Sequence, residues 1–342
     1  MIFRRDEVGV SDGRLPGMSR WMLPAFSVLM LFSYIAPTIL PTRAEDSPEI
    51  KQQVEAAKKL AGTDWAPVVD FELTPGPEIV AMNVLPKPTS PAIEPRKVFD
   101  NVYVLGQKAV WNFAITTPDG IILIDTGYDG NTDKILIPQM KQLGLNPEDI
   151  RYILLTHGHA DHFGGAKYFQ DHYKNIRVGL SAADWDFIPS QGKGAKPTKD
   201  LVLEEGKPIT LGGESITPVS QPGHTPGAMA FIFPVKDFGK PHMVLLLGAV
   251  QLNPEGVPVA TLQQVDESLN HVADVAERMH VDTELAVHPI WDGSEAKLEK
   301  IATRTPGEPN PFVVGEKSHQ RLMKLLDECM KIQIARLNQS GS

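Results

Sequence analysis

Residues 156–165 concentrate side chains that can bind a divalent metal. Three imidazoles and one carboxylate fall within six positions of the run Thr156-His157-Gly158-His159-Ala160-Asp161-His162-Phe163-Gly164-Gly165. In an extended loop, residues two apart project the same way, so His157 and His159 can share one ion. If the chain then turns into a helix, Asp161 and His162 can serve a second ion. Imidazole nitrogen and carboxylate oxygen suit zinc, so the segment predicts a catalytic zinc centre.

The flanking segments indicate how this loop is positioned. The continuous apolar run Tyr152–Thr156 predicts a strand that is buried on both faces and ends at the motif. A helix is expected over Ala166–His172, directly after the motif. Gly158, Gly164 and Gly165 remove side chains that would block a tight loop. We therefore expect the metal-binding loop to lie between a buried strand and a short helix.

Apolar periodicity in the rest of the chain indicates alternating strands and helices. Period-2 or continuous apolar segments predict strands over residues 98–105, 110–116, 121–125, 178–180, 209–211, 215–219, 228–233 and 243–247. Helices are predicted over residues 132–143, 182–188, 265–278, 295–303 and 319–337. Residues 45–61 are expected to be helical or disordered, and the proline-rich residues 67–95 to form an extended loop. This alternation, with several hairpins, predicts a layered α/β fold.

The N-terminal 44 residues have the pattern of a secretory signal. Four arginines lie within the first 20 residues, and residues 21–40 carry no charge. Thr42 and Ala44 are small residues at the expected cleavage site, so the mature protein is expected to be periplasmic or secreted, without stable membrane insertion. Met18 is an alternative start. The uncharged run is also long enough for an uncleaved membrane anchor, although its prolines weaken that interpretation.

The composition excludes several classes of protein. With 42% hydrophobic and 22% charged residues, the 342-residue chain is neither disordered, nor a coiled coil, nor a multi-span membrane protein. The net charge of −9, without a basic patch, argues against nucleic-acid binding, so the expected partner is a small-molecule substrate. Cys329 is the single cysteine, which excludes an internal disulfide and a cysteine-rich metal cluster.

The run from His157 to His162 resembles the signature of the metallo-β-lactamase superfamily. The resemblance implies a four-layer αβ/βα sandwich over residues 97–305, after a lead-in with a proline-rich loop (45–96) and before a C-terminal extension with a helix (306–342). It also implies two downstream histidines, and both are present in the runs Pro222-Gly223-His224-Thr225-Pro226-Gly227 and Ala286-Val287-His288-Pro289. By this resemblance the chain binds two zinc ions, the first through His157, His159 and His224 and the second through Asp161, His162 and His288.

One position departs from most dinuclear hydrolases of this superfamily. Ala249 stands where they carry a metal-bridging aspartate, and alanine cannot bind a metal. The chain then resembles the β-lactamase subclass whose second zinc uses Asp-His-His, which implies opening of the β-lactam amide ring by a metal-bound hydroxide. Asp161 is expected to be a ligand first, with proton transfer as a secondary catalytic role. By the same resemblance, Asp125 is expected to orient a ligand histidine.

Two other functions stay open. The chain could be a metallohydrolase of the same fold that acts on a lactone, a thioester or another ester, although Ala249 counts against this because such enzymes usually retain the bridging aspartate. It could also be a non-enzymatic module that binds a metal or a partner protein. The complete set of six ligands counts against this last class.

Overall fold

The computed structural model describes residues 45–74, 87–249 and 257–339. The expected export signal and part of the proline-rich segment lie outside the described residues. None of the described helices has both the length and the apolar character needed to cross a membrane.

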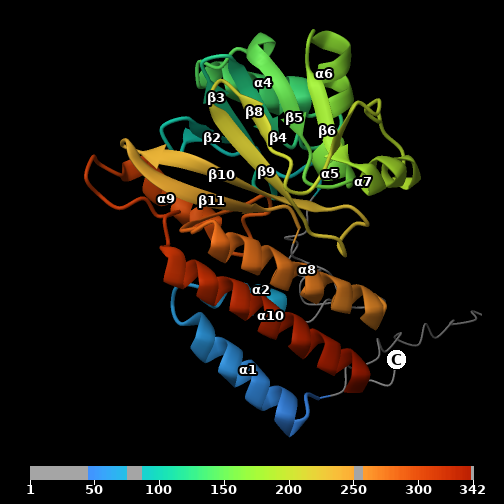
Figure 1. Ribbon diagram of the computed structural model, residues 1–342, viewed down its shortest axis with the longest axis vertical. Helices are drawn as coiled ribbons and strands as arrows, with labels where there is room; N and C mark the ends of the chain where they lie inside the picture. The colour runs from blue at the N-terminus through green and yellow to red at the C-terminus, as the bar shows by residue number, and fades with distance from the viewer. Residues whose placement is uncertain (1–44, 75–86, 250–256, 340–342) are drawn as a thin grey trace, which may run out of the picture. The chain divides into compact units, whose positions relative to one another are not determined.

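Two mixed β-sheets form the centre of the molecule (Figure 1). The first has seven strands in sequential order: β1 (Arg96–Lys97), β2 (Val102–Gln107), β3 (Val110–Thr117), β4 (Gly120–Ile124), β5 (Ile150–Leu154), β6 (Arg177–Ser181) and β7 (Leu201–Leu203). The second has five strands in the order β12 (Thr283–Ala286), β11 (Lys240–Leu247), β10 (Met229–Asp237), β9 (Glu214–Ser220) and β8 (Ile209–Leu211).

Helices cover the outer face of each sheet. The first sheet packs against α4 (Ile137–Gln142), which continues a π-helical turn over Thr132–Leu136, and against α6 (Ala166–His172) and α7 (Ala182–Phe187). The second sheet packs against α2 (Ala66–Glu72), α8 (Val259–Arg278) and α10 (Glu316–Gln339), and α1 (Pro48–Ala61) packs on α10 (Figure 1). The remaining helices are α5 (Ala160–Phe163), within the metal-binding motif, and α9 (Ser294–Thr303). A third apolar core lies between the two sheets, which confirms the predicted four-layer αβ/βα sandwich.

The strand directions explain where a site can form. β4 and β5 are parallel in the first sheet, and β11 and β12 are parallel in the second. β9 runs in the same direction as β11 because each is antiparallel to β10. Met229, at the start of β10, donates its backbone N–H to the Thr156 carbonyl after β5 at 2.8 Å. The carboxyl ends of these five strands therefore reach one edge of the sandwich, where ligands of open α/β sheets generally bind.

The structure corrects the expectation of an extended loop after residue 66. Residues 66–72 form α2, whose Pro67 occupies the first helical turn, where proline removes no helical hydrogen bond. Val68, Val69 and Phe71 are buried in the core formed with α8 and α10. The short strands β1, β7 and β12 were not predicted by apolar patterning, because two to four residues carry too little periodicity.

Candidate metal centre

The six predicted ligands follow the strand ends at this edge. The segment after β5 carries four of them, of which Asp161 and His162 lie in α5; the loop after β9 carries His224, and His288 follows β12 two residues beyond its end. The loop geometry depends on glycine, as expected. A Cβ at Gly164 would lie 2.3 Å from the Asp129 nitrogen, and one at Gly165 would lie 2.4 Å from Thr132 Oγ1. Both positions therefore require glycine, because the neighbouring atoms leave no space for a side chain.

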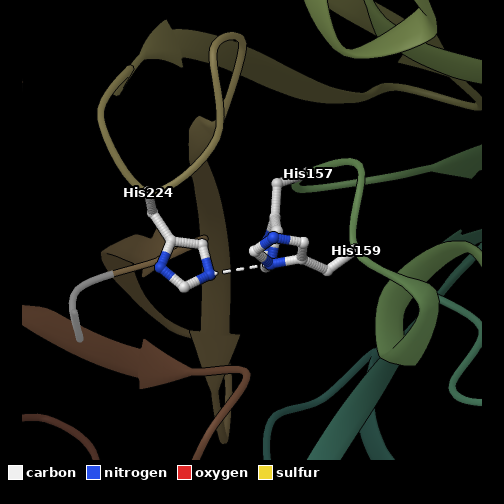
Figure 2. Close-up of side chains that lie close together, drawn as sticks. All are labelled: His157, His159 and His224. Atoms are coloured by element: carbon white, nitrogen blue, oxygen red, sulfur yellow. Dashed lines mark hydrogen bonds between the residues drawn. The ribbon is translucent and has the colours of Figure 1, made fainter. Parts of the chain in front are cut away.

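His157, His159 and His224 form the first group of candidate ligands. One ring nitrogen of each lies within 4.8 Å of the others. Figure 2 shows the three rings turned toward one another from two loops, with His159 Nδ1 and His224 Nε2 2.9 Å apart. His157 is fully buried at the centre of the site. Three imidazoles with a shared focus are the ligand set of a catalytic zinc that keeps one position open.

Asp161, His162 and His288 form the second group. Asp161 Oδ2 lies 3.4 Å from His162 Nε2 and 3.8 Å from His288 Nε2, and the two Nε2 atoms are 3.1 Å apart. Ligands ~2.1 Å from one tetrahedral zinc ion lie ~3.4 Å from each other. The three measured separations bracket this value, so the second group has the dimensions of a zinc site.

Hydrogen bonds fix which nitrogen of each second-group imidazole faces the site. Asp125 Oδ2 accepts the Nδ1 proton of His162 at 2.7 Å, and the Ala109 carbonyl accepts that of His288 at 2.7 Å. In the neutral rings both Nε2 atoms then carry lone pairs that face each other. Two facing lone pairs repel, so the arrangement calls for a proton or a metal ion between them. The contact between Asp125 and His162 agrees with the prediction that Asp125 orients a ligand histidine.

In the first group, a hydrogen bond likewise fixes which nitrogen of His157 faces the site. Thr156 Oγ1 donates its proton to Asp125 Oδ2 at 2.7 Å and lies 3.2 Å from His157 Nδ1. The hydroxyl can therefore accept the Nδ1 proton, which leaves a lone pair on His157 Nε2. That buried Nε2 atom has no hydrogen-bond partner among the described residues. An unpaired buried acceptor is costly, and a bound metal would satisfy it.

Comparisons with known proteins agree with this geometry. A family model described as the metallo-beta-lactamase superfamily matches residues 105–238. The structure of BJP-1, a subclass B3 metallo-β-lactamase of Bradyrhizobium japonicum, is similar with a TM-score of 0.62 and 29% identity, over 74% of this chain and 98% of that chain. The fold is that of the metallo-β-lactamase superfamily. FEZ-1 of Legionella gormanii is similar with a TM-score of 0.60 and 25% identity, over 75% of this chain and 97% of that one.

Curated relatives within this superfamily match over shorter segments. A hydroxyacylglutathione hydrolase of Prochlorococcus marinus is 33% identical over 94 residues, which cover 28% of this chain and 35% of the relative. The hydroxyacylglutathione hydrolase GloC of Haemophilus influenzae is 32% identical over 120 residues, which cover 32% of this chain and 54% of the relative. The chain therefore spans a third to about half of the length of these relatives.

The two ligand groups of this metallo-β-lactamase fold adjoin each other. The ring centroids of His157 and His162 are 3.9 Å apart, so one member of each group is in contact. Ala249 follows the end of β11, and a Cβ on the preceding Gly248 would lie 2.9 Å from Thr156 Cβ. Among the described residues, the two candidate groups contain five histidines and the single carboxylate of Asp161. Within the described part of the chain, neither group therefore includes a carboxylate other than that of Asp161.

The electrostatics of the site favour neutral imidazoles. Burial, together with the neighbouring histidines, holds the pKa of His157 well below its usual value and lowers that of His159 to about 4. Burial and His162 also lower the pKa of His288. Burial opposes a charge on His162, but the carboxylates of Asp161 and Asp125 outweigh it and raise the pKa of His162 to about 10. Without a metal, one proton therefore resides on His162, and a metal must displace it.

Three residues near the site were not among the predicted site residues. The Phe187 ring lies 5.8 Å from that of His159, centroid to centroid, and supplies an apolar wall. Tyr128, in the loop after β4, lies near enough to Asp161 that burial and this carboxylate raise its pKa. Asp184 of α7 contacts the loops of the first group. An aspartate in a first helical turn usually stabilises the helix, so the sequence had no signal to single out Asp184.

Proposed function

We propose that this protein is an exported zinc-dependent hydrolase that opens the amide ring of β-lactams. The observation that carries the proposal is the pair of adjoining ligand groups, in which second-group lone pairs face each other and a buried His157 nitrogen has no partner. Two bound zinc ions would lower the pKa of water to ~7 and polarise a carbonyl oxygen. No serine or cysteine nucleophile is needed for this chemistry, and the sole cysteine, Cys329, is buried in the helical layer.

The protein's own residues would divide the work of binding and orientation. The histidine triad His157, His159 and His224 would hold the first zinc. Asp161, His162 and His288 would hold the second, with Asp161 as ligand first and proton acceptor second. The Phe187 ring, half-buried beside His159, would contact the apolar part of a substrate. The absence of a second carboxylate at Ala249 supports the Asp-His-His type of centre.

The expected small-molecule substrate and the periplasmic or secreted location belong to the same proposal. Similarity to β-lactamase structures over nearly their full length supports the β-lactam substrate. The basic start and uncharged run of residues 1–40 support export. The net charge of −9 argues against nucleic acid as a partner.

A second candidate function is hydrolysis of a thioester. It is favoured by one observation, the sequence similarity to hydroxyacylglutathione hydrolases of 32–33% identity over 94 and 120 residues. Ala249 separates the two candidates, because the proposed β-lactamase centre needs no bridging carboxylate whereas most other hydrolases of this fold retain one.

The test combines metal analysis with a substrate panel. The purified protein should contain close to two zinc ions per chain and hydrolyse a chromogenic cephalosporin, and a chelator should abolish the activity. His157→Ala should lose the first zinc and reduce the rate by more than the ~10–100-fold typical of outer-shell changes. The matched control is His172→Ala, an exposed histidine on α6 that should leave both unchanged.

Two results would contradict the proposal at different levels. Hydrolysis of a thioester or lactone, with no turnover of the cephalosporin, would replace the substrate and keep the metal centre. A wild-type protein that binds no zinc would overturn the hydrolase itself.

A further inference from the structure

Asp184 connects two loops that are far apart in sequence. Its carboxylate is fully buried. Oδ2 accepts hydrogen bonds from the Gly158 backbone at 2.7 Å and from Thr225 Oγ1 at 2.6 Å, and Oδ1 accepts one from the Gly227 backbone at 2.7 Å. All three partners are donors, so this side chain acts only as an acceptor.

Two of the three donors immediately neighbour ligands of the first group, and the third, Gly227, lies three positions after His224. Gly158 lies between His157 and His159, and Thr225 follows His224. Among the described contacts, the Asp184 carboxylate makes no hydrogen bond to these imidazoles. It bonds instead to the loop segments that carry them. Hydrogen bonds to an ionised carboxylate are about twice as strong as those between neutral groups. The Asp184 carboxylate is therefore suited to fix the positions of the two loops.

Helix α7 is itself held firmly, so Asp184 is a fixed reference point. Ser181 Oγ accepts the backbone N–H of Asp184 at 3.2 Å and caps the helix. The buried Trp185 donates from Nε1 to the Leu201 carbonyl at 2.9 Å and ties the helix to β7. The carboxylate therefore cannot follow a loop that shifts away from it.

Close packing between the loops and α7 supports the same conclusion. A Cβ at Gly227 would lie 2.0 Å from Ser181 Oγ, and one at Gly158 would lie 3.0 Å from Phe187 Cδ1. Glycine at both positions lets the two loops approach the helix closely enough to bond to Asp184.

We propose that Asp184 is a positioning residue that sets the distance between His157, His159 and His224 by joining their two loops. The inference rests on the proposed metal centre. It gives the first group a support in addition to Asp125, because Asp125 bonds directly only to His162 of the second group whereas Asp184 acts on the first group through the backbone.

The test is Asp184→Asn, which keeps the shape of the side chain. The amide oxygen can replace only one of the two carboxylate oxygens. The amide nitrogen would then face either the Gly227 donor or the Gly158 and Thr225 donors. Metal-free protein is titrated with Zn²⁺, and Co²⁺ absorption reports each site's ligand geometry. The wild type should bind two ions, and Asp184→Asn should bind one of them ~10–100-fold more weakly with an altered Co²⁺ spectrum.

Two matched comparisons separate positioning from general damage. Asp186→Asn, on the same helix but exposed and paired with Lys199, should titrate like the wild type. Thr225→Val removes one of the three donors and should weaken the same zinc, whereas Thr225→Ser keeps the hydroxyl and should restore the affinity.

Each outcome decides the inference. If Asp184→Asn and Thr225→Val bind two zinc ions with wild-type affinity, Asp184 does not position the first group. If Asp184→Asn does not fold, a Thr225→Val variant with wild-type affinity contradicts the inference, and one with a weakened first site supports it. A wild-type protein without zinc binding would overturn the proposed metal centre and the inference together, whereas two tight sites in every variant would overturn the inference alone.

Discussion

Asp125 is the residue whose side chain supports both ligand groups. Its Oδ2 atom accepts from His162 Nδ1 and from Thr156 Oγ1, and its Oδ1 atom accepts from the Thr156 backbone at 2.8 Å. The residue adopts a φ of 56°, which is unusual for a residue other than glycine. Because the carboxylate is fully buried and uses both oxygens, the local strain is offset by charge-assisted hydrogen bonds.

Asp125→Asn is therefore expected to weaken zinc binding at the second group by ~10–100-fold and to alter the first group through Thr156. In one orientation of the asparagine amide, its nitrogen would face the Thr156 backbone donor. In the other orientation, His162 would lose its proton acceptor. Either change should lower the free energy of unfolding by about 1–3 kcal/mol. Zinc titration and chemical denaturation measure the two effects. Asp129→Asn, exposed in the same loop, is the control, and equal zinc affinity in both variants would refute the role of Asp125.

At the scale of elements, the His224 loop lies between helices from two layers. Helix α7 holds it through Asp184, and α8 contacts it from the other side. Ser268 Oγ of α8 donates to the Pro222 carbonyl at 2.5 Å, and a Cβ at Gly223 would lie 2.4 Å from Val265 Cγ2. The position of α8 therefore restricts the position of His224.

Gly223→Ala should displace either α8 or the His224 loop. Its φ of 135° disfavours any other residue, and the new methyl would overlap Val265, so we expect a loss of about 1–3 kcal/mol in stability and weaker binding at the first zinc site. Gly213→Ala is the matched control, since its φ of 90° imposes strain while its Cβ would meet no atom within 4 Å. Thermal unfolding and zinc titration should separate the two variants; identical titrations would show that packing on α8 does not position His224.

At the scale of the whole molecule, α10 fastens the N-terminal helices to the sandwich. Arg336 donates to Asp46 Oδ2 at 2.8 Å and to the Leu73 carbonyl at 3.0 Å. Glu72 of α2 is buried in this helical layer, and its Oε1 atom has no hydrogen-bond partner among the described residues. Burial raises the pKa of Glu72 to about 7.

This carboxyl should make the stability of the protein depend on pH. The native state keeps the Glu72 proton up to about pH 7, whereas the unfolded chain releases it near its ordinary pKa of 4.5, so stability falls as pH rises through this window. The contribution lost is at most about 3 kcal/mol. Glu72→Gln should flatten the pH profile of denaturant unfolding and stabilise the protein at pH 8, while the exposed Asp70→Asn should not. An unchanged slope in Glu72→Gln would show that Glu72 ionises freely in the native state.

The sequence alone predicted the candidate metal ligands and the class of fold. Residues 157–162 form a compact motif whose ligand types and spacing depend on side-chain identity, and the long apolar runs of β3, β5 and β10 have a clear periodicity. Shorter or proline-containing elements such as α2 and β7 were missed, because their formation depends on burial against distant helices and strands rather than on local pattern.

The tertiary structure decided which atoms meet. His159 and His224 are 65 positions apart, and His162 and His288 are 126 apart, so only parallel strand ends at one sandwich edge bring their nitrogens together. The tertiary structure also decided which ring nitrogens face the site, through hydrogen bonds with Asp125, Thr156 and Ala109. It placed Asp184 in contact with both loops of the first group. These outcomes depend on three-dimensional hydrogen-bond geometry and packing, because side-chain type states what a residue can bind but not what surrounds it.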